Sequence, residues 1–283
     1  MNVADVMTPR SELVTASLPG SREDVLTHLQ ERKFSSVPVV KETADGEVFR
    51  GLVSRERLIE DPNEDQLALL LEEGVTTTRE TPIDELARLM VTADARRVPV
   101  VDGDLEGIVT ITDVVHAIAT GDVDGETPVG ELATSRVNTV YRETPLHVVE
   151  RELSFAEEAY GVVLDDDGEM CGIVTDADII DVAEVVEGEE RTGDSVAGQD
   201  SEWAWEGIKG VGNLYLPTRN VEIPTDPVAS YMTADVVTVS GRRTARETAH
   251  LLISNDVEQI PLVSGDSLGG IVKDMHLLVG LYE

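Results

Sequence analysis

The sequence predicts an α/β protein built from four copies of one β-α-β-β-α unit. The first observation is a glycine motif: residues 107–113 read GIVTITD and residues 172–178 read GIVTDAD. Looser copies of the motif occupy residues 51–57 and 270–276. The second observation is that similar segments precede every copy in the same order, and such regular recurrence is the signature of a structural repeat.

Each repeat begins with a strand and a helix start. The strand is a short β-branched run, such as residues 75–78 or 236–239, and this composition favours strands. A helix start follows, because a hydroxyl caps free amides and proline suits the first helical position. These starts are Ser21, Thr81 with Pro82, Thr144 with Pro145, and Thr244.

A helix and further strands complete the pattern. Leu86, Leu89, Met90 and Ala93 recur at helical spacing and indicate an amphipathic helix docked on strands. Before each glycine motif lies an apolar segment that predicts a buried strand. These segments are 36–40, 97–101, 160–164 and 259–263. A unit of roughly 60 residues buries too little apolar surface to be stable alone, so the repeats are expected to pair.

These markers together resemble CBS domains, which pair into Bateman modules. They are the Met-Thr pairs at 7–8 and 232–233, the Val-Pro segments, and the Gly-Ile-Val-Thr-x-x-Asp pattern. The resemblance implies regulatory binding of adenosine-containing ligands, most often AMP, ADP or ATP. The four-repeat layout is similar to the gamma subunit of AMP-activated kinase and to stand-alone archaeal CBS proteins.

The resemblance also divides the chain into domains. The predicted limits are 1–62 for repeat one, 63–121 for repeat two, 126–187 for repeat three, 188–226 for an insert or linker, and 227–283 for repeat four. Residues 1–121 would form the first Bateman module and residues 126–283 the second. The insert begins with an acidic, Gly-rich stretch typical of a solvated linker. Its later part, Trp203 to Val221, is expected to pack across the second module or to dock a partner.

A hydroxyl and a carboxylate three residues apart occur in only two of the four motifs. They are Thr110 with Asp113 and Thr175 with Asp178. The spacing alone is equally that of a helix-capping box, worth about 1 kcal/mol. The resemblance implies that each Asp accepts hydrogen bonds from both ribose hydroxyls, while each Thr lies beside the ribose and phosphate. Capping and binding can coexist.

Repeats one and four depart from this pattern. Arg57 and His276 stand where the other repeats carry Asp, and neither can accept both ribose hydroxyls in the same way. Their sites are expected to be empty or altered, or to supply positive charge next door. Arg57, Lys273 and His276 are therefore candidate accessory phosphate contacts.

The remaining site residues also follow from the resemblance. An apolar wall is expected from the paired repeat: Val14, Val37 and Pro38 opposite Asp113, and Val236, Val237, Ile260 and Pro261 opposite Asp178. Arg96 and Arg97 match positions where relatives of the kinase gamma subunit carry phosphate ligands, although they could also be solvated charges. The corresponding pairs are Glu258-Gln259 in repeat four and Glu158-Ala159 in repeat three. No cofactor is expected to be required, though Mg²⁺ could accompany ATP.

The composition restricts the setting. The chain has 56 Asp and Glu against 22 Lys and Arg, a formal net charge of −34. This surface suits a salt-accumulating cytoplasm, such as that of a halophilic archaeon, because molar salt shortens the screening length to about 3 Å. The sequence contains no stripe of Lys and Arg, so binding to nucleic acid is not predicted. No leader and no apolar run of about 18 residues is apparent, which predicts a cytoplasmic protein that does not bind membranes.

Catalysis is not predicted. The five His residues are scattered, no metal-ligand cluster or nucleophile motif occurs, and Cys171 is expected to be a small buried residue. The sequence favours a non-catalytic sensor that signals to an unidentified effector protein. Two alternatives stay open: a CBS scaffold without a physiological nucleotide, and a sensor of S-adenosylmethionine. The chain could form a closed disc as a monomer or assemble as a homodimer.

Overall fold

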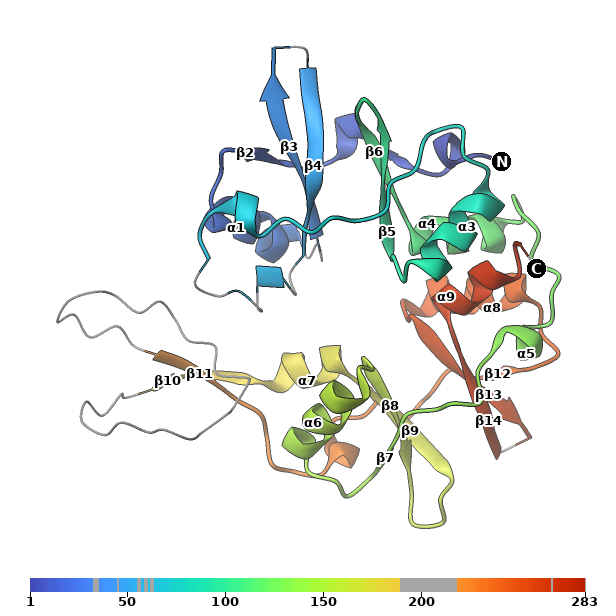
Figure 1. The fold of residues 1–283 in the computed structure, drawn as a ribbon. Coiled ribbons are helices and arrows are strands. Elements are labelled where there is room, and N and C mark those ends of the chain that lie inside the picture. Colours follow the sequence, from blue (N-terminus) through green and yellow to red (C-terminus); the bar gives the residue numbers. More distant parts are fainter. Residues whose placement is uncertain are drawn as a thin grey trace. The chain divides into compact units, whose positions relative to one another are not determined.

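Figure 1 shows the fold in the computed structural model of the protein. The structure describes residues 1–32, 36–44, 46–54, 57–58, 61, 64–188, 218–265 and 267–282. The chain divides into two compact units. The first comprises Met1–Ser135 and Val237–Glu283, and the second comprises Arg136–Val236. The predicted limits of the repeats and modules remain predictions.

Four similar α/β repeats are present, which confirms the predicted fold class. Repeat one consists of β2 (Ala16–Leu18), α1 (Arg22–Arg32), β3 (Ser36–Thr43) and β4 (Gly46–Ser54). Repeat two consists of α3 (Ile83–Thr92), β5 (Arg97–Asp102), β6 (Asp104–Thr110) and α4 (Ile111–Thr120). Repeat three consists of β7 (Thr139–Tyr141), α6 (Leu146–Ala156), β8 (Tyr160–Leu164), β9 (Met170–Thr175) and α7 (Asp176–Val182). Repeat four consists of β12 (Val239–Ser240), α8 (Ala245–Asn255), β13 (Gln259–Ser264), β14 (Ser267–Lys273) and α9 (Asp274–Val279).

The sheets of repeats one, three and four each combine one parallel and one antiparallel pairing. In repeat four, β12 runs parallel to β13, and β13 runs antiparallel to β14. Repeats one and three have the same arrangement. In repeat two a parallel bridge between Thr77 and Val100 takes the place of the short first strand. The chain therefore returns through the first helix, which allows the first two strands to be parallel.

The helix starts differ in detail from the prediction. Pro82 and Pro145 are the N-cap residues of α3 and α6, one position before the helices begin. Thr244 is a capping residue as predicted, and its side chain accepts a hydrogen bond from the Glu247 amide. In α3, Leu86 and Met90 are fully buried as the helical spacing predicts. Ala93 is instead the exposed C-cap residue of this helix.

The repeats exchange the segments that open them, here called the opening segments: residues 2–9, 65–72, 128–134 and 227–233. Repeat one's opening segment pairs with the glycine motif of repeat two, through β1 (Thr8–Pro9) on β6. The opening segment of repeat two pairs in return with β4, between Leu52 and Glu72. Repeats three and four exchange theirs in the same way, as Thr134 on Ile271 and Thr233 on Ile173. Each of these pairings lies within one unit: Thr134 and Ile271 belong to the first unit, and Thr233 and Ile173 belong to the second. The helical turns in these segments are η1 (Val3–Asp5), η3 (Leu67–Leu69), α5 (Val129–Leu132) and η4 (Val228–Ser230), and a further turn, η2 (Arg10–Glu12), follows the first segment.

This exchange explains the glycine that opens each motif. A Cβ atom at Gly107 would lie 2.5 Å from the Thr8 carbonyl oxygen, and one at Gly270 would lie 2.6 Å from that of Thr134. At Gly51 the corresponding distance to the Glu72 oxygen is 2.8 Å, and at Gly172 the added atom would overlap the Met232 sulfur. Any larger residue would therefore push the opening segment away from the sheet.

Helices of repeats two and four form the main core of the first unit. Figure 1 shows α3 and α4 beside α8 and α9, and α4 contacts both helices of repeat four. Ala87, Val115, Ala249 and Leu278 are at most 2% exposed in this core. Repeat one has a smaller core of its own that includes Val25. The core of the second unit includes Val163.

A two-stranded antiparallel ribbon joins the end of the predicted repeat three to the later part of the predicted insert. It pairs β10 (Glu184–Gly188) with β11 (Thr218–Glu222). Trp203 and Trp205 lie outside the described residues, so the predicted packing or docking role of this segment stays a prediction. None of the helices in the described ranges is long and apolar enough to cross a membrane.

The exchanged opening segments make a direct prediction. Gly107→Ala should lower the free energy of unfolding by about 1–3 kcal/mol, because the added methyl group overlaps the Thr8 carbonyl. Gly74→Ala is the matched control, since a Cβ there meets no atom within 4 Å, and it should change stability by less than about 0.5 kcal/mol. Denaturant unfolding measures both, and equal effects would contradict the proposed role of the glycine.

Candidate functional site

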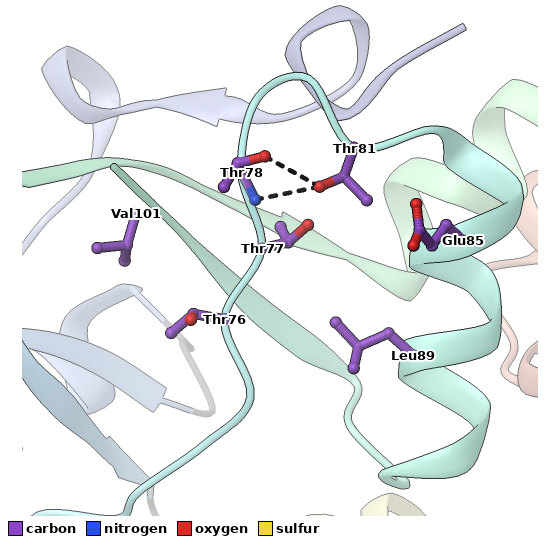
Figure 2. Close-up of a pocket in the computed structure, with 7 residues that line it drawn as sticks. All are labelled: Thr76, Thr77, Thr78, Thr81, Glu85, Leu89 and Val101. Atoms are coloured by element: carbon purple, nitrogen blue, oxygen red, sulfur yellow. Dashed lines mark hydrogen bonds between the residues drawn. The ribbon is translucent and has the colours of Figure 1, made fainter. Parts of the chain in front are cut away.

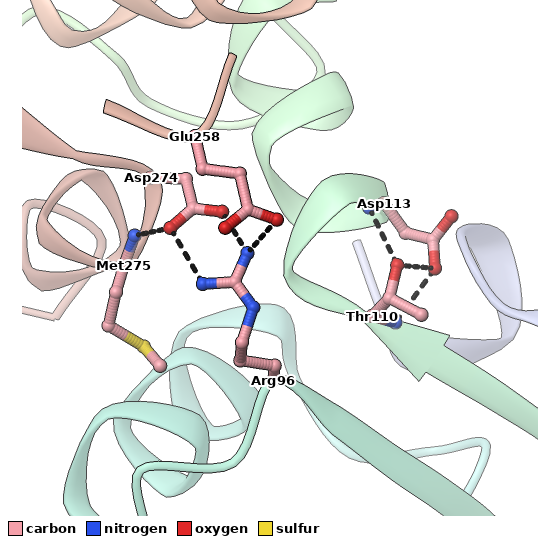
Figure 3. A network of polar contacts seen from close by, with 6 residues as sticks. All are labelled: Arg96, Thr110, Asp113, Glu258, Asp274 and Met275. Carbon is pink, nitrogen blue, oxygen red and sulfur yellow. Dashed lines mark hydrogen bonds and ion pairs between the residues drawn. The ribbon is translucent and has the colours of Figure 1, made fainter. Parts of the chain in front are cut away.

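The predicted pair Thr110 and Asp113 lies where β6 passes into α4. Thr110 is the N-cap of α4, and its hydroxyl donates to Asp113 Oδ2 over 2.7 Å. The Thr110 amide also donates to Oδ2, at 2.7 Å, while the Asp113 amide donates to the Thr110 hydroxyl at 3.3 Å. Figure 3 shows this closed box at the end of the strand. The two residues therefore cap the helix reciprocally.

The second unit contains the same arrangement at Thr175 and Asp178. Asp178 Oδ2 accepts from the Thr175 amide and hydroxyl, both at 2.8 Å, and the return bond from the Asp178 amide is 3.3 Å. The capping interpretation thus applies to both motifs. The close agreement between the two boxes indicates that the local sequence, rather than distant packing, sets the geometry.

The capping role leaves part of each carboxylate available. Oδ1 of Asp113 and Oδ1 of Asp178 accept no hydrogen bond from the residues that the structure describes, and both side chains are half-buried. An ionised carboxylate has about four acceptor positions, so one fixed oxygen can orient the other toward a ligand. The boxes therefore combine a structural role with a preoriented acceptor.

Repeats one and four close the same turn without a carboxylate. In repeat one the Arg57 amide donates to the Ser54 hydroxyl at 3.0 Å, and the Arg57 side chain pairs with Asp61 at 2.6 Å. In repeat four His276 Nδ1 accepts the Lys273 amide at 3.1 Å. Neither turn presents a second carboxylate oxygen. The roles of Arg57, Lys273 and His276 as accessory phosphate contacts stay predictions.

Arg97 lies beside the Thr110 box. In the β5–β6 ladder, Arg97 pairs directly with Thr110. Its side chain is half-buried and, within the described part of the chain, no hydrogen bond or ion pair satisfies it. Burial and the neighbouring charge of Arg96 lower the pKa of Arg97, although the charge of Glu258 opposes them. A guanidinium in this state gains from an anion that approaches it.

Arg96 is in a different situation, because carboxylates of repeat four already hold it. Its guanidinium forms a two-pronged contact with Asp274, at 2.7 and 3.2 Å, and a further ion pair with Glu258 at 2.9 Å (Figure 3). Burial disfavours its charge, but the hydrogen bonds and charge of Asp274, with help from Glu258, raise the pKa of Arg96 overall. Arg96, directly before β5 of repeat two, is thus linked to the start of α9.

Arg96 and its partner Glu258 occupy equivalent positions in repeats two and four. The Ile111 amide donates to the Arg96 carbonyl, and the Asp274 amide donates to the Glu258 carbonyl. Arg96 and Glu258 are therefore counterparts with opposite charge. In repeat three the counterpart is Ala159, which accepts from the Asp176 amide. The predicted match of Arg96 to Glu158 was wrong by one residue, because β8 begins at Tyr160.

The predicted apolar wall is only partly accessible. Val14, Val236 and Val237 are half-buried, whereas Val37, Pro38, Ile260 and Pro261 are buried. β4 and β6, which carry the glycine motifs of repeats one and two, contact each other within the first unit. Asp178 and the segment containing Val237, Ile260 and Pro261 belong to different units. The pairing of that wall with Asp178 stays a prediction.

The next feature is the arrangement of side chains that could bind a metal ion. Among the described residues, no group of three or more His, Cys, Asp or Glu side chains is placed to hold an ion. Cys171 is half-buried, and desolvation raises the pKa of its thiol. A raised thiol pKa disfavours the thiolate that metal binding and nucleophilic chemistry require.

Comparison with known proteins identifies the class. The family described as CBS domain matches residues 3–63, 72–120, 129–184 and 228–282. These four segments cover most of the chain, and the protein belongs to the CBS-domain family. CBS-domain proteins of this kind are regulatory modules.

Individual relatives resemble the chain along nearly its whole length. The uncharacterized protein MJ1404 of Methanocaldococcus jannaschii is 23% identical over 278 residues, which cover 98% of this chain and 61% of that protein. The chain thus spans less than two thirds of that relative. An uncharacterized conserved protein from Pyrococcus horikoshii is 25% identical with a TM-score of 0.70, covering 99% of this chain and 100% of the other. Protein MJ1225 of M. jannaschii, proposed as an archaeal homolog of g-AMPK, is 19% identical with a TM-score of 0.66, covering 98% and 99%. At 19% identity, the likeness to MJ1225 shows a shared fold.

The link between Arg96 and Asp274 can be tested directly. Asp274→Asn should reduce the free energy of unfolding by about 1–3 kcal/mol, because it breaks a two-pronged contact and leaves the guanidinium half-buried. Glu258→Gln is the control: its side chain is 64% exposed, and such exposed pairs contribute about 0–1 kcal/mol. Thermal and denaturant unfolding compare the two variants. A larger loss from Glu258→Gln would contradict this account.

Proposed function

We propose that the protein is a non-catalytic sensor that binds adenosine-containing ligands, AMP, ADP or ATP, and signals to a separate effector protein. The observation that carries the proposal is the pair of Thr-Asp boxes. Each box holds one carboxylate oxygen in a fixed position and leaves the other without a hydrogen bond from the described residues. A carboxylate held in this way suits the two adjacent hydroxyls of a ribose.

Arg97 is the residue best suited to the phosphate. It is the ladder partner of Thr110, and its guanidinium is half-buried without an ion pair in the described ranges. A planar guanidinium binds phosphate oxygens well, and an arginine without a carboxylate partner loses no existing contact on binding. Arg96 contributes in a second way, by holding Asp274 and therefore the start of α9. Mg²⁺ could accompany ATP, but the proposal requires no cofactor.

Regulation requires that the ligand favour one state of the protein. Binding alone regulates nothing if the ligand has equal affinity for both states. The Thr110–Asp113 box begins α4, and α4 packs on α8 and α9 of repeat four. A ligand at the box would thus act on a helix that joins two repeats. The effector would recognise the resulting change in that helical layer.

The ion pairs of Arg96 favour one alternative ligand. Because Arg96 is already neutralised by Asp274 and Glu258, Arg97 is the arginine beside Thr110 that can balance phosphate charge. An adenosyl compound with less negative charge, such as S-adenosylmethionine, would need fewer cations. The strongly acidic composition, with a net charge of −34, favours it further.

Calorimetric titration in molar KCl tests the sensor and its ligand class. AMP, ADP, ATP and S-adenosylmethionine are each titrated into the wild type and into the Asp113→Ala, Asp178→Ala double variant. We expect saturable binding in the wild type and none in the double variant, since both ribose acceptors are gone. Each substitution should also cost about 1 kcal/mol of stability as a lost cap.

The control variant separates capping from binding. Glu247→Ala removes the equivalent box carboxylate at the start of α8, which accepts the Thr244 amide at 3.0 Å. It should cost a similar stability and leave ligand binding unchanged. Arg97→Gln should weaken phosphate-bearing ligands about tenfold, or about 1.4 kcal/mol, and spare S-adenosylmethionine. If the folded wild type binds none of the four compounds, the scaffold interpretation replaces the sensor.

A further inference from the structure

Repeat two contains a pocket that the nucleotide proposal does not use. It has a volume of about 300 Å³ and lies between residues 76–78 and helix α3 (Figure 2). Its lining residues are Thr76, Thr77, Thr78, Thr81, Glu85, Leu89 and Val101. Val101 is near the end of β5 and Arg97 is at its start. The pocket is therefore separate from the Thr110 box.

Thr77 gives the pocket a buried hydroxyl without a partner. The residue is 6% exposed, and its Oγ1 atom forms no hydrogen bond with any described residue. Figure 2 shows the hydroxyl on the side that faces Thr81 and Glu85. A buried hydroxyl without a hydrogen bond reduces stability. Its presence here needs an explanation.

Comparison of the repeats shows that this hydroxyl is particular to repeat two. Thr77 pairs with Val100 across the parallel bridge. The residues in the same register of the other sheets are Ala16, Val140 and Val239. All three are apolar and at most 4% exposed. The fold itself therefore accepts an apolar residue at this position, and only repeat two carries a polar one.

The Glu85 carboxylate does not accept an N-cap amide, unlike the corresponding carboxylates of repeats one and four. In repeats one and four the corresponding carboxylates, on Asp24 and Glu247, accept the N-cap amides of Ser21 and Thr244 at 2.8 and 3.0 Å. In repeat two the N-cap residue is Pro82, which has no N–H group to donate. Within the part of the chain that the structure describes, the Glu85 carboxylate forms no hydrogen bond or ion pair.

The lining determines the kind of ligand. It combines threonine hydroxyls and one carboxylate with the apolar side chains of Leu89 and Val101, and none of its residues is cationic. Asp84, the other acid in the first turn of α3, does not line the pocket. An anion would therefore be repelled, whereas an ammonium group would be attracted by Glu85 and could donate to Thr77.

We propose that this pocket binds a small organic amine. Its ammonium group lies between the Glu85 carboxylate and the Thr77 hydroxyl, and its aliphatic part packs on Leu89 and Val101. The site is independent of adenosine binding, because it shares no residue with the Thr-Asp boxes or with Arg97. Repeat two would then carry two ligand sites of opposite charge preference.

Saturation-transfer NMR on the full chain with n-butylammonium chloride as the probe tests this proposal. We expect transfer to the butyl protons in the wild type, and at least a tenfold loss of affinity in both Thr77→Val and Glu85→Gln. Thr77→Val should fold and keep or raise the melting temperature, since sister repeats carry apolar residues there. Asp84→Asn removes a neighbouring acid that does not line the pocket, and it should change affinity less than twofold.

Four results would each overturn the proposal. The first is an absence of transfer in the folded wild type. The second is unchanged affinity in Thr77→Val. The third is an equal loss in Asp84→Asn and Glu85→Gln, which would indicate only diffuse attraction to an acidic surface. If n-butanol bound as tightly as n-butylammonium, the ligand class would not be an amine and the proposal would also fail.

Discussion

The close approach of one backbone to another above a glycine is the constraint on which this structure depends. In every repeat, an exchanged opening segment lies so near the glycine motif that a Cβ atom would fall within 3 Å of it. The contact satisfies edge groups of each sheet and ties together repeats that are too small to be stable alone. The strand that carries the glycine ends at the start of the second helix, where the Thr-Asp boxes of repeats two and three lie.

One short motif therefore has structural and chemical roles. Its glycine admits the opening segment, its apolar pair enters the core, and its Thr and Asp cap the next helix. The cap fixes the carboxylate that the proposed ligand requires, so the acceptor is preoriented by an interaction that the fold needs in any case. Repeats one and four keep the turn with Arg57 and His276 in place of the acid.

Sequence reasoning reached the features that depend on local pattern. The apolar strands before the glycine motifs, the capping boxes and the four-repeat plan follow from spacing and residue type. The first strands are shorter than predicted: the run at 236–239 forms a strand only at Val239–Ser240, and the run at 75–78 forms a single bridge at Thr77. It did not reach the pairing of Arg96 with Glu258 and Asp274, because that contact joins residues far apart in the chain. Opposite charges at equivalent places in repeats two and four were the available signal. The unpartnered hydroxyl of Thr77 was also out of reach, because a Val-Thr run in a strand gives no sign of which hydroxyl is buried alone.

Native-state hydrogen exchange of the opening segments tests the central claim most directly. The Thr134 amide donates to Ile271 at 3.0 Å, and the Thr233 amide donates to Ile173 at 2.9 Å. If the exchange of segments holds the repeats together, these amides should open with the same free energy as those of the core strands they contact. Rapid exchange of Thr134 and Thr233, with the core strands still protected, would contradict the account.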